Sequence, residues 1–261
     1  MSKKFLFENY ITELTEPDEV DLSSFDLKTE LCPEFWKDGK LNPLVRKELL
    51  EITKDVIEDF DIEGMEFEDI VITGSIANYN WNEEYSDIDL HIIVNFSSIN
   101  DDTELVKKYF DAFRKNWNDT HDEISIYGFP VEIYIQDSNE QHTSTGVYSI
   151  MNNDWVVKPE PNKLSKDDLD EDIIKRKVSE FMNEIDDLQD EFDEAGADYA
   201  EILCDAEDLF DEIKETRKSS MSNGTEMTDG NLIFKALRRN GYIEKLLNIR
   251  TECYDKTHSI E

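Results

Sequence analysis

Two stretches of the chain repeat their apolar residues at helical spacing. Between residues 42 and 60 the apolar positions recur every three or four residues, which predicts an amphipathic helix with Pro43 in its first turn. The same spacing occurs over residues 103–117, where Thr103 is a suitable N-cap. The basic residues of this second helix are expected to form a solvated face: Lys107, Lys108, Arg114 and Lys115.

Apolar runs of strand length separate and follow these helices. DIVIT (69–73) and IDLHIIV (88–94) predict two buried strands. EISIYGFPVEIYIQD (123–137) predicts a hairpin that turns near Gly128 and leads into a longer strand. Two shorter strands are predicted at 146–150 and 154–158.

The pattern becomes helical after about residue 160. Residues 166–217 predict two amphipathic helices with a break near Gly196, and a last helical segment is predicted over 231–256. We therefore expect an α+β fold, with a small mixed sheet and flanking helices followed by a C-terminal helical region. The expected parts are an acidic N-terminal arm (1–40), an α/β core (41–160) and a C-terminal helical domain (161–261).

The charge of the chain limits its partners. It holds 27 basic and 63 acidic residues, a formal net charge of -36. Such a field repels polyanions, so non-specific binding to nucleic acid is not expected. Residues 166–217 contain 21 acidic and 6 basic residues, whereas Gly230 to Lys256 contain 6 basic and 3 acidic residues. The C-terminal segment is therefore a basic island in an acidic chain.

Cysteine and apolar content indicate the compartment. The three cysteines are widely spaced, which predicts neither a disulfide framework nor a zinc site. No apolar run approaches the ~20 residues needed to cross a membrane, and no secretory signal opens the chain. We expect a cytoplasmic protein with no membrane partner.

Three acidic residues stand in the predicted strands of the core. Asp87 and Asp89 share one face of a strand, while Ile88 and the apolar residues after it point the other way. Glu132 lies in a strand that should neighbour this one. Carboxylates held together repel one another unless a cation or proton lies between them, and their hard oxygens suit Mg²⁺ or Mn²⁺. A strand end that exposes both aspartates to water is the simpler alternative.

A Gly-Ser pair precedes these acids by eleven residues. Gly74 allows a phosphate group to approach the backbone, and Ser75 offers a hydroxyl group. A helix that began after this pair would add free N–H groups and the positive end of its dipole. An ordinary turn between two strands is the alternative for the pair taken alone.

Together these residues resemble the signature of the DNA polymerase β-like nucleotidyltransferase superfamily. The match is Gly74, Ser75, Asp87, Asp89 and Glu132 in that order, within a core of about residues 45–137. The resemblance implies that the three acids bind the catalytic divalent ions and that the Gly-Ser turn binds the phosphates of a nucleoside triphosphate such as ATP. It implies transfer of a nucleoside monophosphate to an acceptor with release of pyrophosphate.

The acceptor is expected to be a protein or a small molecule, because the net charge disfavours nucleic acid. The basic island offers Lys235, Arg238 and Arg239 at i, i+3 and i+4, on one face of a helix, where they could bind the triphosphate. Pairing of these bases with the preceding acidic helices is an equal alternative.

The segment FLFENYITELTEP (5–17) loosely resembles the capsid-targeting leaders of tailed bacteriophages, since 11–13 and 14–16 both fit a hydrophobic-x-Glu cleavage site. A phage-encoded chain would act in the host cytoplasm or be packaged in the virion.

Two other functions fit the sequence. A catalytically silent protein could keep the site for nucleotide binding. An acidic interaction module could instead use the helices of residues 166–217 to bind a basic partner.

Overall fold

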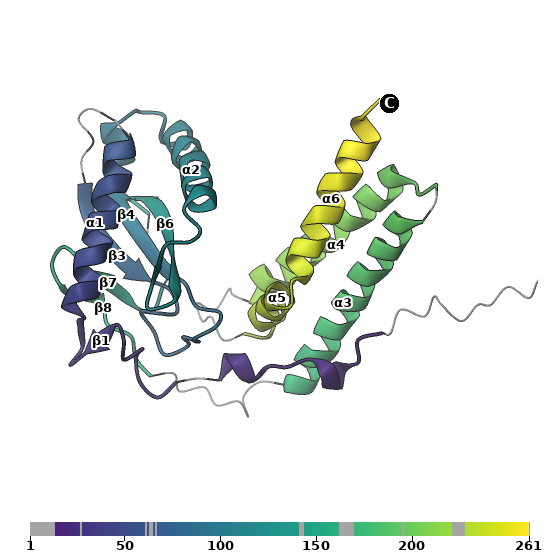
Figure 1. Ribbon diagram of the computed structural model, residues 1–261, viewed down its shortest axis with the longest axis horizontal. Helices are drawn as coiled ribbons and strands as arrows, with labels where there is room; N and C mark the ends of the chain where they lie inside the picture. The colour runs from purple at the N-terminus through teal and green to yellow at the C-terminus, as the bar shows by residue number, and fades with distance from the viewer. Residues whose placement is uncertain are drawn as a thin grey trace, which may run out of the picture. The chain divides into compact units, whose positions relative to one another are not determined.

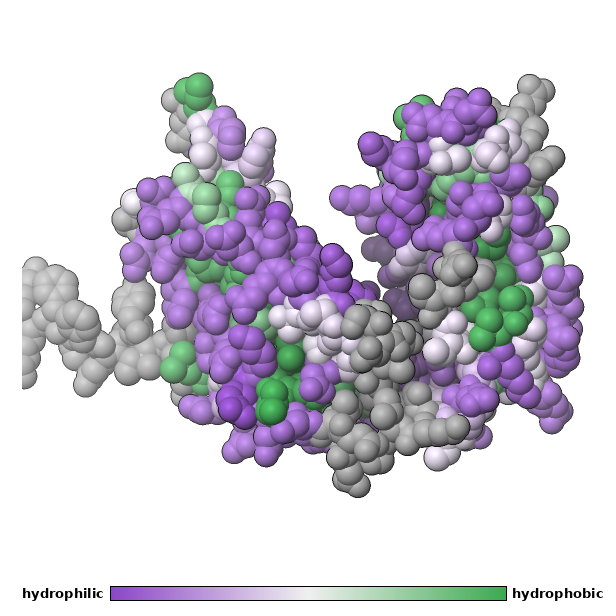
Figure 2. Space-filling model, turned by 180° about the vertical axis from the view of Figure 1, so that it is seen from behind, coloured by the Kyte–Doolittle hydropathy of each residue, from purple (hydrophilic) through white to green (hydrophobic). Residues whose placement is uncertain are grey.

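The computed structural model describes residues 14–260 except 27, 61, 63–64, 66, 141–143, 162–169, 195 and 221–227. The chain folds into two compact units, one formed by residues 25–163 (the sheet unit) and one by residues 1–24 and 164–261 (the helical unit) (Figure 1). Most of the surface visible in Figure 2 is hydrophilic, with small apolar areas, in keeping with the charge of the chain. The leader-like segment 5–17 lies mostly outside the described residues.

A six-stranded mixed sheet is the centre of the sheet unit. Its order is β5-β6-β4-β3-β7-β8, and β4 and β6 are parallel whereas the other neighbours are antiparallel. The α+β class predicted from the sequence is confirmed, and every predicted strand is present. The strands are β3 (Phe67–Thr73), β4 (Ile88–Val94), β5 (Ser125–Ile126), β6 (Phe129–Asp137), β7 (Val147–Ser149) and β8 (Asp154–Val157).

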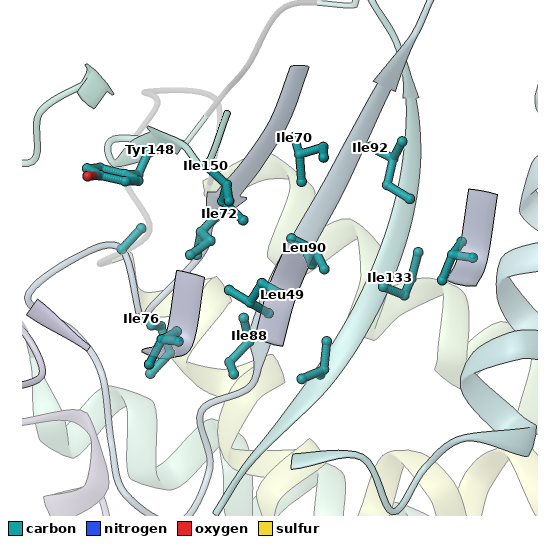
Figure 3. Packing of buried hydrophobic residues seen from close by; sticks show 14 of the residues in the cluster. Leu49, Ile70, Ile72, Ile76, Ile88, Leu90, Ile92, Ile133, Tyr148 and Ile150 are labelled. Atoms are coloured by element: carbon teal, nitrogen blue, oxygen red, sulfur yellow. The ribbon is translucent and has the colours of Figure 1, made fainter. Parts of the chain in front are cut away.

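Two helices pack into the apolar core on one face of this sheet. They are α1 (Pro43–Phe60) and α2 (Thr103–Thr120), both at the positions that the periodicity predicts. Leu49 of α1 and Phe110 of α2 belong to the same buried cluster as alternate residues of the strands, several of which are drawn in Figure 3. These strand residues are Ile70, Ile72, Ile88, Leu90, Ile92 and Ile133.

The start of α2 differs by one residue from the prediction. Asp102 is the N-cap, because its carboxylate accepts a hydrogen bond of 3.1 Å from the backbone N–H of Leu105. Thr103 is the first helical residue. A carboxylate at this position also interacts favourably with the helix dipole. A short 3₁₀ turn, Phe96–Ser98, lies between β4 and α2.

Part of the segment expected to form an N-terminal arm packs onto the sheet unit. Phe35 and Trp36 are buried, and a small hairpin forms from β1 (Trp36–Lys37) and β2 (Lys40–Leu41). The indole N–H of Trp36 donates a 2.7 Å hydrogen bond to the carbonyl of Ile76, in the loop that follows β3. These residues therefore help to position the loop that carries the Gly-Ser pair.

The helical unit contains α3 (Glu171–Asp193), α4 (Tyr199–Ser220), α5 (Asp229–Arg239) and α6 (Tyr242–His258), with a 3₁₀ turn at Pro17–Glu19. A second 3₁₀ turn, Ser23–Phe25, spans the point in the sequence where the sheet unit begins. The predicted break near Gly196 is confirmed. The last segment is helical as predicted but divided into two helices, because Gly241, at φ +78°, separates α5 from α6. Within the described residues, no helix is both long and apolar enough to cross a membrane.

Helix α2 also forms hydrogen bonds with the outer edge of β6 through the side chain of Asn118. The Asn118 side chain accepts a 3.0 Å hydrogen bond from the N–H of Ile133, and its amide donates at 3.3 Å to the carbonyl of the same residue. Strand β5 pairs only with the first two residues of β6, so Asn118 takes the place of a neighbouring strand further along this edge.

We expect Asn118→Ala to lower the free energy of unfolding by about 1–3 kcal/mol, because two backbone groups of β6 lose their partner. Urea denaturation followed by circular dichroism measures this change. Asn116→Ala removes the same side chain from an exposed position on the same helix and should cost far less. Equal losses in the two variants would show that the edge contact does not stabilise the sheet.

Candidate active site

The Gly-Ser pair lies directly after β3, in a series of turns rather than at the start of a helix. Gly74 has a φ of +71°, a conformation that favours glycine. No helix begins after this pair, so the N–H groups and dipole of a helix N-terminus are not available at Gly74–Ser75. The carbonyls of Ile76 and Tyr79 accept hydrogen bonds from Trp36 and from the backbone of Lys28, respectively, so the N-terminal segment uses groups that a helix would have paired internally.

A hydrogen bond between two serines closes the loop that joins β3 to β4. The Ser75 hydroxyl donates at 2.8 Å to Oγ of the buried Ser86, which also accepts at 2.9 Å from the backbone N–H of Asn82. Ser86 immediately precedes Asp87. The loop therefore brings its two ends together and holds the Gly-Ser pair beside the start of the acidic strand.

Strand pairing places Asp89 at the centre of the site. Asp89 is paired with Glu132 in the parallel ladder of β4 and β6, and with Thr73 in the antiparallel ladder of β3 and β4. Paired residues in adjacent strands point to the same face of a sheet. Asp89 and Glu132 therefore project side by side from the face opposite the α1–α2 core, and Asp87 lies just before β4.

Gly74 and Asp89 are in direct contact. A Cβ atom placed on Gly74 would lie 1.7 Å from Oδ2 of Asp89 and 2.8 Å from its Cγ. No side chain fits at residue 74 unless the Asp89 carboxylate moves away. The missing side chain thus brings the turn within contact distance of the Asp89 carboxylate.

A stack of planar side chains continues this polar face along the strands. The Tyr134 ring stacks on His91, with centroids 4.8 Å apart, and the Arg114 guanidinium lies 4.7 Å from the Tyr134 centroid. The Tyr134 hydroxyl donates a 2.8 Å hydrogen bond to Oε2 of Glu132. Burial, together with the charges of Glu132 and Asp89, raises the pKa of Tyr134, so its phenol remains a proton donor.

Tyr134 and Ser86 were not recognised from the sequence as parts of the site, and Arg114 was assigned another role. Tyr134 could have been found, because it lies two residues after Glu132 and strand alternation puts both on one face. Arg114 was expected on a solvated face, but α2 runs beside β6 and its side chain reaches the Tyr134 ring. Nothing in the local sequence distinguishes Ser86 from an ordinary loop serine.

The three acids fit a divalent cation by donor type and strand register, but not by their present side-chain positions. Among the described residues, no three His, Cys, Asp or Glu side chains form a group that could hold a metal ion. Glu132 accepts the Tyr134 hydroxyl, and the Asp89 carboxylate lies against Gly74. These carboxylates must therefore rotate before they can share an ion with Asp87.

The basic residues Lys235, Arg238 and Arg239 lie on α5 in the helical unit. Arg239 donates a 2.6 Å hydrogen bond to the hydroxyl of Ser24 in the same unit. Their binding of a triphosphate stays a prediction. Other bases of the island do pair with the acidic helices, since Lys245 contacts Asp186 at 2.6 Å and Arg250 contacts Glu207 at 3.6 Å.

Comparisons with known proteins add little to this geometry. No protein-family model matches the chain. A search of curated proteins also finds no match. A solved structure of the STING-associated CdnE c-di-GMP synthase from Capnocytophaga granulosa is similar at 15% sequence identity, over 83% of this chain and 84% of that one, with a TM-score of 0.23. A TM-score this low supports no argument about this chain.

We expect Gly74→Ala to destabilise the protein more than Gly39→Ala does. Both glycines have a similar positive φ, +71° and +74°, but a Cβ on Gly39 meets no atom within 4 Å. Each variant should lose roughly 1–2 kcal/mol from its left-handed conformation, and Gly74→Ala should lose more because Asp89 must be displaced.

Urea denaturation measures both losses. In an Asp89→Ala background the additional loss at Gly74 should disappear, as a double-mutant cycle would report. An additional loss that persists in that background would contradict a contact between the two residues.

Proposed function

We propose that this chain is a nucleotidyltransferase that depends on Mg²⁺ or Mn²⁺ and transfers a nucleoside monophosphate from a nucleoside triphosphate to an acceptor. The observation that supports this most directly is the position of Asp89, between the Gly74–Ser75 turn and Glu132. A turn that can bind phosphates and two carboxylates in register can position the triphosphate and its cations, and positioning and charge neutralisation dominate catalysis of this reaction.

Each residue of the site has a defined role in this proposal. Gly74, which has no side chain, would let a phosphate reach the backbone at the end of β3 once the Asp89 carboxylate moves from the space beside it, and the Ser75 hydroxyl can turn from Ser86 to a phosphate oxygen. Asp87, Asp89 and Glu132 would hold the divalent cations. When bound, these ions neutralise charge on the triphosphate and lower the pKa of the acceptor hydroxyl.

The transfer itself is a single displacement at the α-phosphorus. An acceptor oxygen forms a bond to this phosphorus, the bond to the bridging oxygen of the β-phosphate breaks, and pyrophosphate leaves with the bonding electron pair. The proton of the acceptor hydroxyl passes to solvent, since we assign no side chain as a general base. The protein contributes mainly position and charge, which dominate catalysis of phosphoryl transfer.

The charge of the chain favours a protein or a small molecule as the acceptor. With a net charge of -36, the long-range field opposes the approach of a polyanion. A small acceptor or a protein surface of opposite or neutral charge meets no such barrier. This argument concerns the acceptor class only and leaves the nucleobase open.

The arrangement of the acids also supports one other function. Because they are not grouped for a metal ion in the structure, the chain could bind a nucleotide at Gly74–Ser75 without turning it over. The two functions differ in one outcome, since only the enzyme incorporates label into an acceptor.

Asp87→Ala and Asp89→Asn should lower transfer on the order of 100-fold or more, the typical cost of losing one group that stabilises charge in the transition state. The assay incubates the protein with Mg²⁺ and each α-labelled ribonucleoside triphosphate, with and without cell lysate. Glu84→Ala removes an exposed acid of the same loop and should retain activity.

No label in any fraction, combined with no heat of triphosphate binding in calorimetry, would refute both the enzyme and the nucleotide-binding alternative. Heat without label would favour the silent binding protein.

Tyr134→Phe should strengthen the binding of Mn²⁺ in the absence of nucleotide. Loss of the hydroxyl releases Glu132 from a hydrogen bond whose net value is about 0.5–1.5 kcal/mol, so the affinity should rise roughly two- to tenfold. Calorimetric titration measures the affinity, and Tyr109→Phe on the exposed side of α2 serves as the control. Unchanged affinity would mean that the Tyr134 hydroxyl does not restrain Glu132.

A further inference from the structure

Two lysines face each other across the β1–β2 hairpin. Lys37 and Lys40 are direct cross-strand partners, joined by a turn in which Asp38 and Gly39 both have positive φ, +52° and +74°. Like charges directly opposite in a hairpin are destabilising. In a chain with a net charge of -36, such a local concentration of positive charge is unusual and suggests a function for the two lysines.

The lysines belong to the wall of a pocket of about 430 Å³, here called the hairpin pocket. Arg46 of α1 is the third cation of its lining, against one acid, Asp38. Leu41 and Pro43 supply apolar surface. The volume falls within the range of small-molecule sites, and a concave site lined by one sign of charge concentrates ions of the other sign.

The turn between β7 and β8 positions two of the three cations. Arg46 donates from Nε to the carbonyl of Ile150 at 2.8 Å and from Nη2 to the carbonyl of Met151 at 3.2 Å. Lys40 donates from Nζ to the carbonyl of Asn153 at 3.1 Å. Because their positions are set before any ligand arrives, less conformational entropy is lost when one binds.

Two further features near the hairpin pocket, the N-terminus of α1 and the ion pair of Lys40 with Asp154, are compatible with a bound anion. Pro43 is the first residue of α1, so the positive end of an 18-residue helix lies at the lining. Lys40 also pairs with Asp154 at 2.7 Å, but both side chains are more than half exposed (51% and 67%). An exposed ion pair contributes little stability, so Lys40 can exchange this partner for a ligand at small cost.

We propose that the hairpin pocket binds a phosphate-bearing small molecule. Two clustered lysines act as point charges for phosphate oxygens, Arg46 adds fixed positive charge, and the apolar residues can contact the organic part of the ligand. Gly74, Asp89 and Glu132 are not among the residues that line the hairpin pocket. This proposal therefore does not rest on the proposed nucleotidyl transfer.

Pyrophosphate is the first probe, titrated calorimetrically into the full chain at low ionic strength with EDTA present. EDTA removes the divalent cations that the acids would need in order to bind the same anion. We expect measurable binding that weakens as salt is added, because the contacts are ionic and exposed. Absence of binding under these conditions overturns the proposal.

Substitutions of the lining lysines test whether pyrophosphate binds in the hairpin pocket. Lys37→Glu and Lys40→Gln should each weaken it at least about fivefold, the effect of one unit charge at about 4 Å in water. Lys54→Glu is the control, since Lys54 lies on α1 outside the lining, pairs with Glu58 at 3.3 Å, and changes the net charge as Lys37→Glu does. An equal effect of Lys54→Glu and Lys37→Glu, or no effect of Lys37→Glu, overturns the proposal.

Two further titrations show where the anion binds and which kind of phosphate compound the pocket prefers. Asp89→Asn must bind pyrophosphate as the wild type does, and a change of affinity in either direction in that variant would place the anion near the acids instead and overturn the proposal. Titrations with ATP and with inorganic phosphate then distinguish an organic ligand from a free phosphate. If the apolar wall contacts the ligand, ATP binds more tightly than pyrophosphate.

Discussion

The contact between Asp89 and Gly74 is the constraint on which the site depends. A carboxylate in the central part of a sheet must reach water, a cation or hydrogen-bond donors, since burial of an unpaired charge is costly. Asp89 meets this requirement because it projects from the face opposite the α1–α2 core, and because residue 74 has no side chain to occupy its space. Ile88 and Leu90, on either side of it in sequence, are fully buried in the core.

Helix α2 connects the stability of the sheet to the geometry of the site. Phe110 and Trp117 on one side of the helix enter the core, while Asn118 bonds to the edge of β6. Arg114, one turn before Asn118, lies over Tyr134, which in turn donates to Glu132. The position of the third acid therefore depends on a helix that the functional signature does not include.

The net charge of the chain conceals local differences that matter for binding. Within the helical unit, Lys245 and Arg250 of the basic island contact Asp186 and Glu207, so part of its charge is used internally. The hairpin pocket is different, because two of its cations face each other across a turn. Such local fields, rather than the average of -36, decide where a small anion binds, since water and salt screen charges beyond about 10 Å.

Several features of this protein follow from its sequence alone. Periodicity was sufficient for α1, α2 and the strands, because a 3.6-residue or two-residue repeat reports which face is buried wherever the element lies. Gly74, Ser75, Asp87, Asp89 and Glu132 were proposed as site residues on different grounds, their order and spacing and the likeness to a known signature. Only the tertiary structure decided that β4 and β6 run parallel and in the register that sets Asp89 beside Glu132. That pairing joins segments separated by α2, and no local pattern encodes the partner of a strand. The same holds for Tyr134, Arg114 and the hairpin pocket, whose members come together from distant parts of the chain through packing.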